Sequence, residues 1–92
     1  MIRSFASRDT EALFGGESPR NFRSFQAQAE RKLQMLDSAK DLVDLLVPPG
    51  NRLEKLSGGR RGQHSIRIND QWRICFRWRD DGPWDVEIVD YH

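Results

Sequence analysis

The fold of this chain is decided by the stretch HSIRINDQWRICFRWR, residues 64–79. Apolar side chains occupy every second position in each of its two halves, which is the period of a β-strand with one buried face. The alternating residues are His64, Ile66 and Ile68, then Trp72, Ile74, Phe76 and Trp78. We therefore predict two neighbouring antiparallel strands, over residues 64–68 and 72–79.

The connection between these strands decides which side chains share a face. A two-residue turn would pair Ile66 with Arg73 and mix apolar and charged residues on one face. A three-residue loop, Asn69-Asp70-Gln71, pairs Ile66 with Ile74 and Ile68 with Trp72 instead, so we predict this loop or an equivalent bulge. The same register places four arginines on one open face, namely Arg67, Arg73, Arg77 and Arg79.

On either side of this hairpin the chain predicts one more strand and a helical half. After the turn at residues 80–83, alternation resumes over residues 84–89, with Trp84, Val86 and Ile88 on the apolar face. Residues 1–5 read as a short strand. Three helices follow: one capped by Asp9-Thr10 and ended by Gly15-Gly16, one over residues 22–36, and one begun by Ser38 with Asp41 and stopped at Pro48. We predict an α+β fold, with two to three N-terminal helices on one face of an antiparallel-rich sheet and an open, arginine-rich opposite face.

Size and composition narrow the class of protein. Ninety-two residues make a single domain, residues 1–92. Cys75 is the one cysteine and no Cys/His ligand spacing exists, so we expect no disulfide, no metal and no cofactor. The N-terminus lacks a signal-peptide core, and no stretch approaches the ~18 apolar residues of a membrane span. We expect a soluble, unprocessed, cytoplasmic protein with no membrane partner.

The net charge of +1 hides a strong asymmetry along the chain. Residues 1–49 are balanced, residues 50–79 carry eight basic and two acidic side chains, and residues 80–92 carry five acidic and no basic ones. Twelve of the fifteen basic residues are arginine, which suits bidentate phosphate contacts. The middle third therefore indicates a polyanionic partner.

Cleavage of RNA by its own 2′-hydroxyl needs a base, fixed cations for the phosphorane and an acid for the leaving oxygen. Arginine suits only the cation role, because it does not give up its proton at neutral pH. The base and acid candidates are His64, His92, Asp90, Glu54 and Tyr91. Alternation puts Tyr91 on the arginine face and Asp90 and His92 on the other, so the strand would have to end or twist near Val89 for all three to serve one site.

Each candidate also has a purely structural interpretation. Asp90 could be a salt-bridge partner, Tyr91 a strand aromatic and His64 a half-buried structural histidine. The tryptophans follow the apolar period, so we interpret them as core rather than as base-stacking platforms. We interpret Cys75 as packing, although neighbouring arginines could acidify a thiol.

The run NRLEKLSGGRRGQHSIRINDQWRICF, residues 51–76, resembles the HigB toxins of the RelE/ParE superfamily, as do residues 1–5 and the closing Asp90-Tyr91-His92. The resemblance implies a RelE-like fold and a toxin that cleaves mRNA on the ribosome. It also implies a helix-turn-helix (HigA-like) antitoxin, through which alone operator DNA would be bound. Carried over by position, Arg73, Asp90, Tyr91 and His92 would be catalytic. Contacts to RNA or the ribosome would come from Arg60, Arg67, Arg77, His64 and Glu54.

Two positions depart from the family pattern. Some HigB toxins carry a histidine and a lysine where this chain has Glu54 and Ser57. Glu54 could still act as a base, but the lysine charge is lost, so the resemblance implies a weak endoribonuclease and a mild toxin. The alternative is a binder without nuclease chemistry, either a ParE-like gyrase inhibitor or an inhibitor of translation or ribosome assembly. We expect the antitoxin to dock on the helical half.

Overall fold

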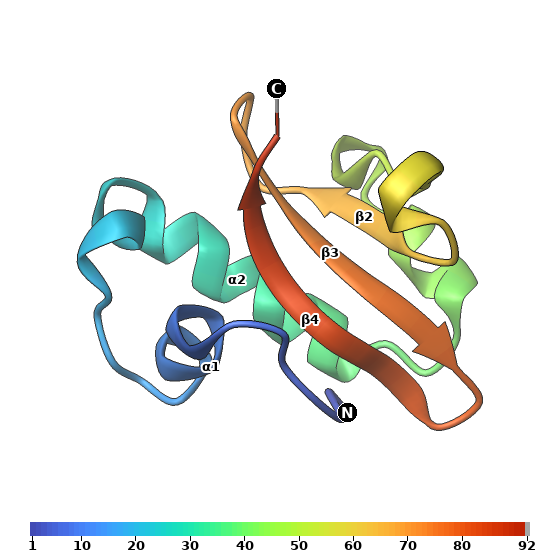
Figure 1. Ribbon diagram of the computed structural model, residues 1–92, viewed down its shortest axis with the longest axis horizontal. Helices are drawn as coiled ribbons and strands as arrows, with labels where there is room; N and C mark the ends of the chain where they lie inside the picture. Colours follow the sequence, from blue (N-terminus) through green and yellow to red (C-terminus); the bar gives the residue numbers. More distant parts are fainter. Residues whose placement is uncertain (92) are drawn as a thin grey trace.

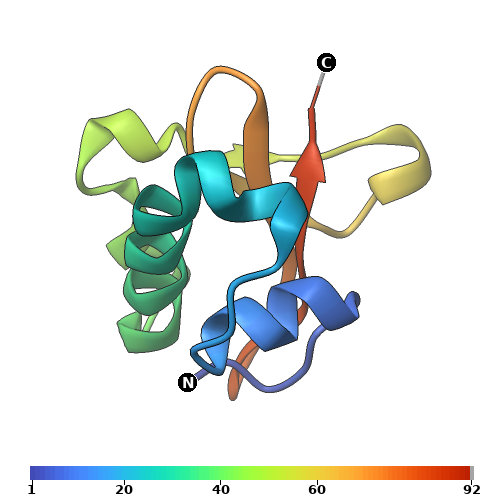
Figure 2. The ribbon, with the colours of Figure 1, turned by 90° about the vertical axis from the view of Figure 1, so that its left-hand side faces the viewer.

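The computed structural model describes residues 1–91 and shows helices beside a four-stranded antiparallel sheet with strand order β1-β2-β3-β4 (Figure 1). In the view of Figure 2, α1 and α2 both lie in front of the strands. The predicted α+β class is confirmed. The elements, with η marking 3₁₀ helices, are α1 (Arg8–Phe14), η1 (Arg20–Phe25), α2 (Gln26–Ser38), η2 (Leu42–Leu46), η3 (Pro49–Asn51), β1 (Glu54–Lys55), η4 (Gly58–Arg60), β2 (His64–Arg67), β3 (Trp72–Arg79) and β4 (Gly82–Asp90).

The β2–β3 hairpin has the register that the apolar alternation predicts. Ile66 pairs with Ile74, and the amide of Ile68 donates to the carbonyl of Trp72 at 2.9 Å. Asn69 closes the loop, because its Oδ1 accepts a hydrogen bond from the amide of Trp72 at 2.8 Å. The three-residue loop is therefore confirmed, and with it the face on which each side chain of β2 and β3 lies.

The β3–β4 pairing contains a bulge that the sequence analysis did not anticipate. Cys75 pairs with Glu87 but Arg77 pairs with Trp84, so β4 carries one extra residue between these pairs. Asp85 accommodates it with a φ of 54°. The bulge reverses the alternation and turns Trp84 onto the arginine face. The prediction that Trp84 lies on the apolar face is therefore wrong.

The first two helices begin at other residues than predicted. Ser7, rather than Asp9 or Thr10, is the N-cap of α1, since its Oγ accepts a hydrogen bond from the amide of Thr10 at 3.2 Å. The predicted helix over residues 22–36 is divided, with Phe22 in η1 and α2 beginning only at Gln26. The apolar spacing thus identified the buried face but not the change of helix type.

The predicted third helix is a single 3₁₀ segment, η2, and its N-cap is Asp41 rather than Ser38. Asp44 completes a capping box: its Oδ2 accepts hydrogen bonds from the amides of Lys40 and Asp41, both at 3.0 Å. The segment ends before Pro48, as predicted, because proline offers no amide to continue the helix.

The N-terminal residues follow β4 without forming a strand. The amide of Arg3 donates to the carbonyl of Pro83 at 2.8 Å and the amide of Ala6 to that of Val86 at 2.9 Å. Phe5 and Val86 form one isolated parallel bridge. The predicted strand over residues 1–5 is therefore wrong. Conversely, the two-residue strand β1 was not predicted, because two residues carry no readable alternation.

The hydrophobic core lies between the helices and one face of the sheet. Its most deeply buried members are Leu13, Phe22, Ala29, Leu33, Leu36, Leu45, Ile66, Ile74, Phe76 and Val86. Trp72 packs against Phe25, with ring centroids 4.9 Å apart, and Trp78 against Phe76 at 6.5 Å. Their interpretation as core residues is confirmed. Among the described residues, no helix is long and apolar enough to cross a membrane.

Candidate active site

Three side chains meet on the sheet face that points away from the helices: Glu54 of β1, Arg73 of β3 and Tyr91, which follows β4. The guanidinium carbon of Arg73 lies 5.6 Å from the centroid of the Tyr91 ring, and its Nη2 lies 3.9 Å from Oε1 of Glu54. The amide of Tyr91 donates to the carbonyl of Gln71 at 2.7 Å, which holds the end of the chain beside β3. A cation, a carboxylate and a phenol are thus gathered from distant parts of the sequence.

Arg73 is not on an open face, as the alternation predicted, but is only 7% exposed. A charge this buried needs hydrogen-bond partners. Its Nε donates to Oγ of Ser65 at 2.8 Å, and its Nη2 donates to the carbonyl of Arg52 at 2.6 Å. Neither partner was a candidate in the sequence analysis. Tertiary packing therefore converts a surface arginine into a fixed, buried one.

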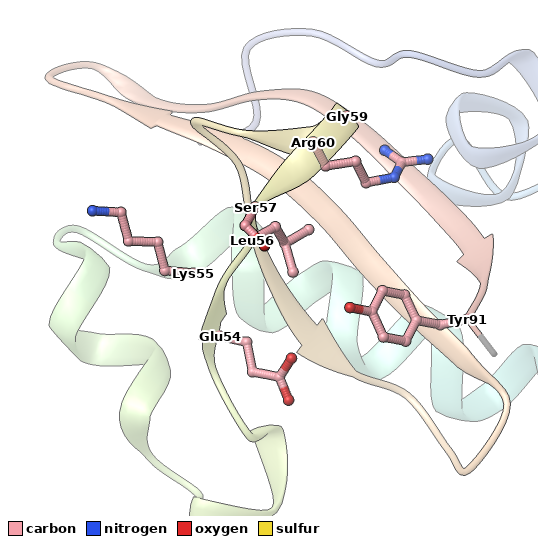
Figure 3. Close-up of a pocket in the computed structure, with 7 residues that line it drawn as sticks. All are labelled: Glu54, Lys55, Leu56, Ser57, Gly59, Arg60 and Tyr91. Carbon is pink, nitrogen blue, oxygen red and sulfur yellow. The ribbon is translucent and has the colours of Figure 1, made fainter.

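Two hollows flank this cluster, and Glu54 and Tyr91 line both. The larger, of about 480 Å³, is also lined by Lys55, Leu56, Ser57, Gly59 and Arg60. In Figure 3 the Glu54 carboxylate and the Tyr91 ring point toward one another across it. The smaller, of about 290 Å³, is also lined by Arg52, Arg67, Asn69, Asp70 and Arg73. The smaller hollow contains Arg73 and is the richer in cations, so it is the one better suited to an anion.

Arg79, which the alternation also placed on this face, lies over the ring of Trp84, 5.1 Å from its centroid. Arg67 and Arg77, and Arg60 beside them, have carboxylate partners. The pairs are Arg60 Nη1 with Glu87 Oε1 at 3.3 Å, Arg77 Nε with Asp85 Oδ2 at 3.5 Å, and Arg67 Nη2 with Asp70 Oδ1. These side chains are partly exposed, so each pair is weak, on the order of 0–1 kcal/mol, and can open for a polyanion. Carboxylates from β4 and the β2–β3 loop thus reduce the net positive charge that the sequence predicts for this face.

Asp90 is not brought to this cluster. It pairs with Trp72 across β3 and β4, which places it on the helix side of the sheet. Its Oδ2 accepts a hydrogen bond from Nε2 of Gln71 at 3.0 Å. The pairing with β3 therefore stays regular from Ile88 to Asp90, and the change of face needed to bring Asp90 beside Tyr91 does not occur within the described residues. His92 lies outside the described residues.

His64 is not brought to the cluster either. It pairs with Phe76 across the hairpin, and the two rings stack with centroids 6.2 Å apart. Burial, and secondarily the charge of Lys55, lowers the pKa of His64 below its usual value. This placement agrees with the structural interpretation of His64. Cys75 is also buried, and burial raises the pKa of its thiol, so its interpretation as a packing residue is confirmed.

The cluster can supply a fixed cation and a proton acceptor, two of the groups that phosphodiester cleavage by the 2′-hydroxyl requires. The buried guanidinium of Arg73 can stabilise charge on a phosphorane, and the Glu54 carboxylate can accept a proton. Tyr91 offers a ring face and a hydroxyl at the rim. Within residues 1–91, no group of three His, Cys, Asp or Glu side chains is arranged to hold a metal ion.

Comparison with known proteins gives a match to a family model and two curated relatives. A family model described as RelE-like toxin of type II toxin-antitoxin system HigB matches residues 4–92. Toxin HigB-1 of Vibrio cholerae serotype O1 is 52% identical over 50 residues, which are 54% of this chain and 53% of that protein. An uncharacterised protein of Haemophilus influenzae is 35% identical over 51 residues, which are 55% of this chain and 50% of that protein. The match thus spans about half the length of these curated relatives.

Among solved structures, the YoeB-YefM complex from Staphylococcus aureus contains a chain with a similar fold. The TM-score is 0.63 at 20% sequence identity, over 100% of this chain and 98% of that one. At this identity the likeness concerns the fold alone, and it supports the arrangement of helices against one face of an antiparallel sheet.

Proposed function

This chain belongs to the HigB-like family, the RelE-like toxins of type II toxin-antitoxin systems, and we propose that it is an endoribonuclease that cleaves mRNA on the ribosome. One observation carries the proposal. The guanidinium of Arg73 is buried and hydrogen-bonded at the edge of a hollow whose rim bears the Glu54 carboxylate and the Tyr91 phenol. A fixed cation beside a proton acceptor is what phosphodiester cleavage requires.

The reaction we propose is attack by the ribose 2′-oxygen on the adjacent phosphorus. A base removes the 2′-hydroxyl proton as the bond from the 2′-oxygen to phosphorus forms. The bond from phosphorus to the 5′-oxygen of the next nucleotide breaks, and that oxygen takes up a proton. The products are a 2′,3′-cyclic phosphate and a 5′-hydroxyl, and no metal or cofactor is consumed.

We assign Arg73 to the non-bridging phosphate oxygens, where its charge matches the extra negative charge of the phosphorane. Glu54 is the proposed base, because its half-exposed carboxylate lies beside Arg73 on the same rim. Tyr91 packs on the Arg73 guanidinium and presents its ring to a nucleobase. His92, one residue further, is the proposed acid, and Asp90 anchors this tail through Gln71.

The proposed RNA and ribosome contacts come from the partly exposed arginines of the face, Arg60, Arg67 and Arg77. Each is held by a carboxylate that phosphate can displace, and no intact buried network has to be broken. The catalytic strength is expected to be low, because Ser57 on the rim supplies no charge where some relatives have a lysine.

The further partner we propose is a helix-turn-helix antitoxin, through which the pair would bind operator DNA. The helical side carries exposed apolar residues of η2 and its C-cap, Val43, Leu46 and Val47, on the part of the molecule where we expect the antitoxin to dock. An antitoxin docked there would leave the sheet face that carries Arg73 uncovered.

The proposal is tested by expressing wild type, Arg73→Ala and the control Arg31→Ala, which changes an exposed residue of α2, and mapping mRNA 5′ ends by primer extension. We expect new ends with wild type and Arg31→Ala and none with Arg73→Ala. If Arg73→Ala remained toxic but produced no new mRNA 5′ ends, the nuclease assignment would be wrong. A supercoiling assay on purified gyrase would then separate a gyrase inhibitor from a binder of the ribosome.

A further inference from the structure

Arg73 differs from its neighbouring arginines in what holds it. Arg60, Arg67 and Arg77 are each bound by a carboxylate. The hydrogen-bond acceptors of Arg73 within residues 1–91 are neutral, a hydroxyl and two backbone carbonyls. The carboxylate of Glu54 is 3.9 Å from Nη2, beyond hydrogen-bond distance. Neutral acceptors fix the direction of a guanidinium without cancelling its charge, so that charge stays available to a phosphate.

Ser65 supplies two of these acceptors. Its Oγ lies 2.8 Å from Nε of Arg73, and its carbonyl lies 3.4 Å from Nη2. The residue is fully buried. It sits two positions before Arg67, which pairs directly with Arg73, so Ser65 lies diagonally across the hairpin on the same face. The buried hydroxyl of Ser65 therefore accepts its hydrogen bond from the Arg73 guanidinium.

Arg52 supplies the third acceptor through its backbone. Its carbonyl lies 2.6 Å from Nη2 of Arg73. The residue has φ 46° and ψ 55°, the left-handed conformation that residues other than glycine rarely adopt. Since ψ sets the direction of the carbonyl, a right-handed conformation at Arg52 would turn this oxygen away from Arg73.

The unusual conformation at Arg52 is held from the preceding residue. Asn51 is fully buried. Its Nδ2 donates to the carbonyl of Leu45 at 3.2 Å, and its Oδ1 accepts from Nζ of Lys32 at 2.6 Å. The side chain therefore ties the end of η3 to η2 and to helix α2. A continuous set of contacts links the helical layer to the carbonyl that holds Arg73.

We propose that Ser65 and the backbone carbonyl of Arg52 are the positioning groups that hold Arg73 for reaction. These groups accept hydrogen bonds from Nε and Nη2. In the proposal, Nη1 is therefore the nitrogen that donates to the phosphate. This inference rests on the proposed function for its catalytic consequence, but the fixing of Arg73 is a property of the folded protein alone.

The test measures the two consequences separately. Hydrogen exchange of the Arg73 Nε proton is followed by NMR in full-length wild type, Ser65→Ala and Thr10→Val, and kcat and KM are measured on ribosome-bound mRNA. Thr10 is the matched control: it is also fully buried, and its Oγ1 accepts the amide of Ile88 at 3.0 Å, on the helix side of the sheet. Ser65→Ala should speed exchange of the Arg73 proton about tenfold or more, the effect of losing one hydrogen bond from a charged group.

We further expect Ser65→Ala to lower kcat by roughly 10- to 100-fold with KM changed little, because a misdirected group acts on the transition state. Thr10→Val should leave exchange of the Arg73 proton and kcat near wild type. Unchanged exchange in Ser65→Ala, or an equal loss of kcat in both variants, would overturn the proposal. If wild type cleaves no RNA, the proposed function fails, and the exchange rates still decide whether Ser65 holds Arg73.

A second pair isolates the carbonyl. Arg52→Gly and Arg52→Val both remove the Arg52 side chain, but only glycine adopts the left-handed conformation readily. We expect the Nη2 protons of Arg73 to stay protected in Arg52→Gly and to exchange faster in Arg52→Val. Equal exchange in the two variants would show that the backbone conformation at this residue does not position Arg73.

Discussion

The guanidinium of Arg73 lies over the ring of Tyr91, 5.6 Å from its centroid, although eighteen positions separate the two residues in the sequence. The ring of Tyr91 packs on the guanidinium. The Ser65 hydroxyl and the Arg52 carbonyl accept hydrogen bonds from its Nε and Nη2. The contact between Arg73 and Tyr91 couples the last described residue of the chain to the centre of the sheet. Substitution of Tyr91 should therefore alter the position of the Arg73 guanidinium.

Replacing Arg73 should abolish cleavage while leaving a folded protein. Arg73→Lys keeps a charge but cannot reach the acceptors of Nε and Nη2 together, so we expect kcat to fall about 10²- to 10³-fold, as when one transition-state donor is lost. The buried acceptors left unpaired should lower the free energy of unfolding by roughly 1–3 kcal/mol in urea titrations. Activity within threefold of wild type would contradict the role of the planar guanidinium.

Tyr91 should act mainly through its ring. Tyr91→Phe keeps the surface that packs on Arg73, whereas Tyr91→Ala removes it. The cation–π contribution of about 0.5–2 kcal/mol predicts a loss of roughly 2- to 30-fold in kcat/KM for alanine, with little loss for phenylalanine. The measurement is the rate of cleavage of ribosome-bound mRNA. If phenylalanine is as damaging as alanine, the hydroxyl carries the function instead.

Glu54 should be needed for its proton affinity rather than for its contact with Arg73. Glu54→Gln keeps the shape and removes the base, so kcat should fall by about 10²- to 10⁴-fold. Glu17→Gln, an exposed carboxylate before η1, is the control. A kcat of Glu54→Gln within threefold of wild type would assign the base elsewhere.

Ser57 offers a gain-of-function test. It lines the larger hollow beside Glu54 and Arg60, and Ser57→Lys would add the charge that the resemblance to HigB toxins leads us to expect at this position. A screened cation near the phosphate is worth roughly 1 kcal/mol, which predicts about a fivefold rise in kcat/KM. Ser57→Gln, of similar length but neutral, should give no rise. An equal rise in both variants would point to shape rather than charge.

His64 should make the protein less stable in mild acid. Its Nδ1 is buried and has no hydrogen-bond partner among the described residues, and burial with the charge of Lys55 lowers its pKa in the folded state below the usual 6.5. The unfolded state therefore binds more protons below about pH 6.5. His64 weakens folding increasingly as pH falls from 6.5 toward the folded pKa, and the loss is complete below that pKa.

The check is urea unfolding of wild type and His64→Gln at pH 7.5 and at pH 5.5. The difference between the two proteins should shift in favour of His64→Gln at the lower pH, because glutamine does not titrate. The carboxylates contribute equally to both and cancel in the comparison. A difference that does not change with pH would mean that His64 protonates without cost in the folded protein.

The sequence by itself determined the β2–β3 hairpin and its register. A slip by one residue would move every side chain to the other face, so the alternation from Ile66 to Trp78 leaves one acceptable pairing, which the structure has. The family resemblance pointed to Arg73, Asp90, Tyr91 and His92 as one site, and the structure brings Arg73 and Tyr91 into contact.

Only the tertiary structure decided what surrounds them. Alternation reports which residues prefer burial, but not which distant segment covers a polar face. No local sequence pattern predicts the left-handed conformation of Arg52, the bulge at Asp85 or the buried hydrogen bond between Ser65 and Arg73. Arg52 and Ser65 supply the acceptors that the buried charge of Arg73 requires, and only the folded chain brings these segments together.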